Sequence, residues 1–140
     1  MTINIHIRQL GKKRSIISAV PFELPTQPAD VRTLIIAVVQ VCVAAYNERV
    51  RKGETGIRPM SEESLADMET IGKLAFGVNY GDKEADEAAA IANALQSFED
   101  GLYRIFLGQT ELTALDESLA LTEQDELTFI RLTMLSGSIF

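Results

Sequence analysis

The sequence contains a single cysteine, a single histidine and no tryptophan among its 140 residues. One thiol cannot form a disulfide within the chain, and Cys42 lies in the apolar run from Leu34 to Ala45, which is typical of a buried and unreactive thiol. One histidine cannot supply a cluster of metal ligands. We therefore expect no disulfide, no metal and no other cofactor.

Sequence motifs of catalysis are also missing. The chain has no nucleophile elbow, no phosphate-binding loop, no paired Cys-x-x-Cys and no His-Glu-x-x-His. Its acidic groups, such as Glu62-Glu63 and Glu123 to Glu126, fall at expected helix starts and turns, where carboxylates are well solvated and favour the helix dipole. The sequence predicts a protein that is not an enzyme.

Positive charge is scarce and scattered. The net charge is −7, and the densest basic stretch is the short segment from Lys12 to Arg14. Nucleic acid is therefore an unsuitable partner, because phosphate binding requires a basic face. No apolar run is long enough to cross a bilayer of about 30 Å as a helix, and the segment from Met1 to His6 does not resemble a secretory signal. We expect a cytoplasmic protein that does not bind a membrane.

The residues that are present predict one α+β domain over residues 1–140. Apolar and polar residues alternate from Thr2 to Arg8, which is typical of a half-buried strand. A second strand is expected from Ser15 to Leu24, and Pro21 favours an edge position because proline donates no ladder hydrogen bond. Apolar residues at helical spacing then predict a long core helix from about Asp30 to Arg51.

The remaining two thirds contain two further helices followed by strands. Helices are expected from Ser61 to Gly77 and from Asp82 to Gly101, and their apolar faces favour packing as a hairpin. The spacing of apolar residues returns to the two-residue alternation of strands from Leu102 to Leu107 and again from Leu127 to Leu135. An irregular stretch anchored by leucines separates these two strands.

This order of elements resembles the β-grasp of ubiquitin-like proteins. The segment from Met1 to Ile7 is similar to the start of ubiquitin, and the segments from Leu102 to Leu112 and from Asp125 to Ile130 are similar to its last strands. The resemblance implies a mixed sheet of four to five strands packed on one helix, with the first and last strands as parallel neighbours. Residues 54–100 would then be a helical insertion within the single domain.

The resemblance also suggests a binding surface. If Leu127 and Phe129 face the helix, then alternation turns the neighbouring apolar side chains of the last strand outward, and we expect the same of Tyr103, Ile105 and Leu107 on the preceding strand. The candidate partner-binding residues are Ile105, Ile130, Leu132 and Met134. Such an apolar face must be covered, either by the inserted helices, by a partner protein or by a second copy of the chain.

A second candidate site is the tail. Ubiquitin and the sulfur carriers similar to it end in an extended Gly-Gly that is activated at its carboxylate. This chain departs from that pattern, because Ser136 precedes Gly137 and the residues from Ser138 to Phe140 follow it. Conjugation at Gly137 would require removal of those three residues.

Together these features predict a noncovalent protein-interaction module or adaptor in a bacterial multiprotein system, recognised by a protein partner. Two alternatives stay open. One is a ubiquitin-like modifier or sulfur carrier activated at Gly137, and the other is a small-molecule-binding or enzymatic domain that uses a pocket between the sheet and the inserted helices.

Overall fold

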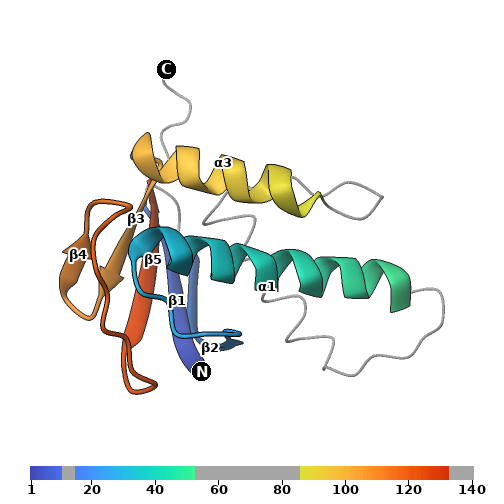
Figure 1. The fold of residues 1–140 in the computed structure, drawn as a ribbon, viewed down its shortest axis with the longest axis horizontal. Coiled ribbons are helices and arrows are strands. Elements are labelled where there is room, and N and C mark those ends of the chain that lie inside the picture. Colours follow the sequence, from blue (N-terminus) through green and yellow to red (C-terminus); the bar gives the residue numbers. More distant parts are fainter. Residues whose placement is uncertain (11–14, 53–85, 133–140) are drawn as a thin grey trace.

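The protein has a mixed α+β fold with an open five-stranded sheet. The computed structural model describes residues 1–10, 15–52 and 86–132, and within these ranges two helices lie against the sheet (Figure 1). The strand order is β2-β1-β5-β3-β4. The expected helix from Ser61 to Gly77 lies outside the described residues, so the structure describes only the second helix of the predicted hairpin.

The first two strands form the predicted hairpin. β1 (Thr2–Leu10) pairs antiparallel with β2 (Ser15–Glu23), and their ladder places Ile3 opposite Phe22. The prediction that the strand containing Pro21 lies at an edge is confirmed, because β2 is the first strand in the sheet order. A proline at this edge removes no hydrogen bond from the centre of the sheet.

The last strand lies beside the first. β5 (Glu126–Leu132) runs parallel to β1, with Ile5 opposite Leu127 and Ile7 opposite Phe129. All four side chains are buried, so the prediction of parallel central neighbours facing the core is confirmed. Two segments more than a hundred residues apart in the sequence thereby form the centre of the sheet.

The other half of the sheet is a second, shorter hairpin. β3 (Tyr103–Leu107) pairs antiparallel with β5 on one side and with β4 (Thr110–Leu112) on the other. Gly108 begins the turn between β3 and β4 with a φ of 60°, a conformation that glycine adopts without steric cost. β4 falls in the stretch that the sequence suggested would be irregular, and Leu112, Leu115 and Leu121 within that stretch are buried as anchors.

Helix α1 (Val31–Lys52) covers one face of the sheet. Asp30 caps its first turn by accepting a hydrogen bond from the backbone N–H of Thr33 at 2.8 Å, and this bond lowers the pKa of Asp30. The segment Val31–Glu48 of α1 has a mean hydropathy of 1.4 and is long and apolar enough to cross a membrane. However, 56% of this segment is buried within the protein. Cys42 is fully buried in this helix, as predicted.

Helix α3 (Glu87–Glu99) lies antiparallel beside α1 on the same side of the sheet (Figure 1). Asp86 caps its start, and Gly101 ends it with a φ of 76°, which lets the N–H groups of Gly101 and Leu102 bond to the carbonyls of Phe98 and Ser97. The buried Ala94 allows α1 to approach closely. Within the described residues, α3 therefore thickens the helical layer and leaves the opposite sheet face uncovered by helices.

Candidate functional site

In β3, the residues that face the helices are the ones that the sequence predicted to face away from them. Ile105 lies opposite Phe129 in the ladder, and both side chains are fully buried on the face that α1 and α3 cover, which we call the inner face. The prediction that Tyr103, Ile105 and Leu107 point away from the helix is wrong. Residues directly opposite in neighbouring strands share a face, so the inward Phe129 requires an inward Ile105. Ile105 is a core residue and is not available to a partner.

Tyr103 shows how α3 completes this inner face. Its ring stacks on Phe129 with the centroids 6.2 Å apart, and its hydroxyl donates a hydrogen bond of 2.8 Å to the carbonyl of Ala94 in α3. Burial raises the pKa of Tyr103 well above its ordinary value. The hydroxyl therefore stays protonated and links the sheet to α3.

The opposite face carries a small apolar centre between two cations. Arg8, Ile130 and Arg104 lie side by side on β1, β5 and β3, and Phe106 is the next outward position on β3. Ile130 and Phe106 are half-buried, whereas both arginines are exposed. We call these four residues the outer-face patch. The aliphatic stems of arginines commonly cover a neighbouring apolar side chain while the charged ends stay in water.

Only one of the predicted partner-binding residues belongs to the outer-face patch as the structure describes it. Ile130 has the predicted outward position. The side chain of Leu132 and the whole of Met134 and Gly137 lie outside the described residues. Phe106 and the two arginines were not predicted as site residues, although Arg104 offered a signal, because a charged residue within β3 disfavours burial of its own face.

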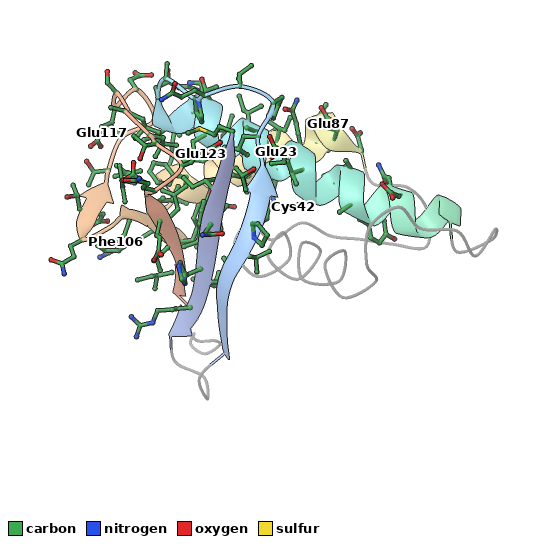
Figure 2. All side chains as sticks on the ribbon, turned by 90° about the horizontal axis from the view of Figure 1, so that it is seen from below. Glu23, Cys42, Glu87, Phe106, Glu117 and Glu123 are labelled. Atoms are coloured by element: carbon green, nitrogen blue, oxygen red, sulfur yellow. The ribbon has the colours of Figure 1, made fainter. Side chains whose placement is uncertain are left out.

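Charge is unevenly distributed along the sheet. Glu23 and Glu123 lie at the end where β1 begins (Figure 2), and both accept hydrogen bonds from Thr2. The bond from the Thr2 hydroxyl, followed by the amino terminus, lowers the pKa of Glu23. Farther along, His6 contacts Glu126 at 3.0 Å. Arg8 and Arg104 lie beyond these acids, and Glu111, which pairs with Arg104, lies opposite Phe106. The outer-face patch therefore carries two arginines with one carboxylate at its border.

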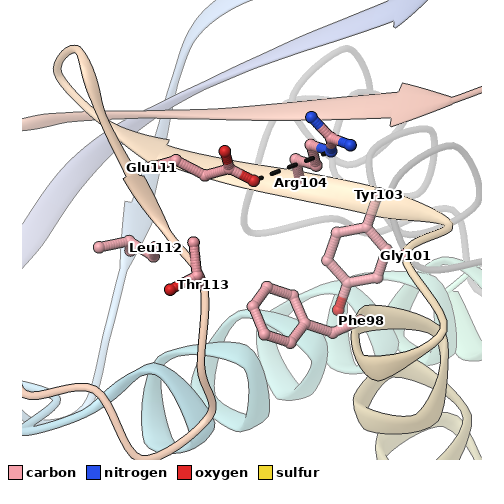
Figure 3. A pocket seen from close by; sticks show the side chains of 7 residues that line it. All are labelled: Phe98, Gly101, Tyr103, Arg104, Glu111, Leu112 and Thr113. Atoms are coloured by element: carbon pink, nitrogen blue, oxygen red, sulfur yellow. Dashed lines mark ion pairs between the residues drawn. The ribbon is translucent and has the colours of Figure 1, made fainter.

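A hollow of about 160 Å³ lies where α3 meets the second hairpin (Figure 3). We call it the α3–β4 hollow. It is lined by Phe98, Gly101, Tyr103, Arg104, Glu111, Leu112 and Thr113. Ligand pockets typically measure about 300–1,000 Å³, so this space suits one side chain rather than a whole cofactor. The hollow lies between the sheet and α3, which is where the sequence-based alternative of a small-molecule site expects a pocket.

The polar rim of the hollow is an ion pair between neighbouring strands. The Nε atom of Arg104 lies 3.8 Å from Oε2 of Glu111, and the arginine side chain is 55% exposed (Figure 3). This separation is too long for a hydrogen bond. In the part of the chain that the structure describes, no group of three or more histidines, cysteines or carboxylates is arranged to hold a metal ion.

No family profile, no curated protein and no solved structure matches the chain significantly. The strand topology, the outer-face patch and the α3–β4 hollow are therefore the features that indicate a function.

Proposed function

We propose that this chain is a ubiquitin-like β-grasp protein with an insertion over residues 54–100. The strand order β2-β1-β5-β3-β4 supports the assignment. The first and last strands are parallel neighbours at its centre, with β2 beside β1 and the β3–β4 hairpin beside β5. α1 follows the first hairpin and packs on one face, as the resemblance implies. α3 belongs to the insertion and extends the helical layer.

The function that fits this fold is noncovalent recognition by a larger protein partner, as an adaptor of a bacterial multiprotein system in the cytoplasm. The observation that carries the proposal is the outer-face patch. Its apolar centre is flanked by Arg8 and Arg104 on a chain whose net charge is −7, and neither helix within the described residues covers it. Buried apolar contacts surrounded by charged groups are the usual anatomy of a specific interface.

The substitution Ile130→Asp tests this function. A carboxylate at position 130 would replace the apolar centre by a charge and would pair with Arg8 or Arg104 in place of the partner, so capture of partners from an extract of the native host should be lost. The fold should persist with a loss of no more than about 1 kcal/mol, because the side chain is only half-buried. Affinity capture followed by mass spectrometry, with circular dichroism on the same samples, provides both readouts.

Ala44→Asp is the matched control, because it adds the same charge at an exposed position of α1. This variant should capture the same partners as the unmodified chain. Unchanged capture by a folded Ile130→Asp variant would contradict the proposed function. Unfolding of that variant would instead make the outer face an internal packing surface, and a change from dimer to monomer in light scattering would show that a second copy occupies it.

A further inference from the structure

The α3–β4 hollow and the outer-face patch share one residue, Arg104. We propose that the hollow receives a single aliphatic side chain from the protein partner, and that Arg104 binds a carboxylate next to that side chain. This inference rests on the proposed function, because it assigns a chemistry to the partner that the outer-face patch would bind. The partner segment would cross the patch and continue over the edge formed by β3 and β4.

The size of the hollow fits one side chain. At about 160 Å³ it is similar to the engineered protein cavity of about 150 Å³ that accepts benzene. A leucine, isoleucine or methionine side chain occupies a similar space. An intact nucleotide or cofactor does not fit, because pockets for such ligands are typically at least about 300 Å³.

The lining of the hollow combines buried aromatic and aliphatic side chains with the polar side chains of Arg104, Glu111 and Thr113. Phe98 and Leu112 are buried in the hydrophobic core, and the ring of Phe98 packs against that of Tyr103 with centroids 5.8 Å apart. The Tyr103 hydroxyl already donates to Ala94, so it offers no free donor to a ligand. Gly101 leaves its side of the rim open, since no heavy atom lies within 4 Å of the Cβ that another residue would carry there. An aliphatic group flanked by a polar or charged one is therefore the chemistry that the hollow favours.

Charge complementarity selects what accompanies that group. Glu111 faces the Nε atom of Arg104 at 3.8 Å, which leaves the other nitrogen atoms of an exposed guanidinium to bind an incoming anion. A carboxylate can accept two hydrogen bonds from those atoms. Arg8, across Ile130, adds positive charge on the same face. A partner segment with an acidic group beside an aliphatic residue meets both requirements.

A titration of the full chain with N-acetyl-L-leucine, followed by amide chemical shifts in NMR, tests the inference without the unknown partner. This probe carries an isobutyl group beside a carboxylate. We expect saturable shifts at the amides of Tyr103, Leu112 and Thr113, with a dissociation constant in the millimolar range, as befits one anchoring side chain. N-acetyl-L-leucinamide lacks the charge and should bind about two- to fivefold more weakly, the effect of one exposed ion pair.

Arg104→Gln should remove this preference, so that the acid and the amide bind with equal affinity. Arg32→Gln is the control, because Arg32 forms an exposed ion pair with Asp116 on another part of the surface. Absence of saturable shifts around the hollow, equal affinity for both probes, or an unchanged preference in Arg104→Gln would each overturn the inference. Micromolar affinity for the free probe would also overturn it, because the hollow would then be a small-molecule site.

The outcome is separable from that of the proposed function. If the hollow fails to bind the probe while Ile130→Asp still abolishes partner capture, the outer-face patch keeps its function and only the anchoring role of the hollow is lost. If the hollow binds the acidic probe as expected but Ile130→Asp leaves capture unchanged, the proposed docking face is wrong.

Discussion

The two faces of the sheet are built from the same strands but differ in how deeply their side chains are buried. On the inner face, Ile5, Ile105 and Phe129 are fully buried beneath the two helices. On the outer face, the half-buried Phe106 and Ile130 lie beside exposed arginines. Alternation along each strand places these sets only one residue apart. The inner face therefore stabilises the fold, and the outer face is the one on which we propose that a partner binds.

The largest expected contrast between the faces comes from two identical substitutions. Phe129→Ala removes a ring from the centre of the core and should lower the free energy of unfolding by about 3–5 kcal/mol, through lost burial and the cavity that remains. Phe106→Ala, on the outer face, should cost about 1 kcal/mol because the ring is only partly removed from water. Urea denaturation of both variants measures the difference. Equal losses would mean that the outer face is packed as tightly as the core.

A smaller effect tests the link between the inner face and α3. Tyr103→Phe deletes the buried hydroxyl that donates a hydrogen bond to the Ala94 carbonyl. We expect a loss of about 1 kcal/mol in the free energy of unfolding, with an unchanged dependence on urea. Hydrogen exchange at the amides of α3 should accelerate in this variant. Exchange as slow as in the unmodified chain would show that the hydroxyl does not hold α3 on the sheet.

The smallest effect concerns acid sensitivity at the end of the sheet opposite the arginines. The lowered pKa values of Glu23 and Asp30 mean that the unfolded chain binds more protons than the folded chain in acid. Their contribution to stability is therefore present above the ordinary values of 4.5 and 3.8 and is lost as the pH falls through the lower folded values. The double variant Glu23→Gln, Asp30→Asn, whose side chains do not titrate, should lose less stability between pH 5 and pH 2, a window of about three pH units. Identical slopes of stability against pH would contradict this origin.

The sequence was sufficient for most local structure. Strict alternation identified β1, helical spacing identified α1, and Gly101 marked the end of α3. The parallel pairing of β1 with β5 was predicted through the resemblance to ubiquitin-like proteins. These features depend on short-range patterns or on a familiar order of elements.

The face of β3 was predicted incorrectly because register is a long-range property. Tyr103, Ile105, Phe106 and Leu107 are all apolar, so alternation alone does not decide which set is buried. The ladder with β5 decides it, together with α3, which covers Tyr103. The α3–β4 hollow was unpredictable for the same reason, since its lining comes from one helix and two strands that meet only in the folded chain.

The proposed recognition surface requires Ile105 and Phe106 to face opposite sides of β3, and thiol labelling tests this directly. Ile105→Cys and Phe106→Cys would each be made in a Cys42→Ala chain, so that one thiol is present. A cysteine at position 106 should react with a soluble disulfide reagent nearly as fast as in the unfolded chain. A cysteine at position 105 should react at least about a hundredfold more slowly, because labelling requires opening of the core. Comparable rates, or faster labelling at position 105, would contradict the assignment of the two faces and the proposed recognition surface.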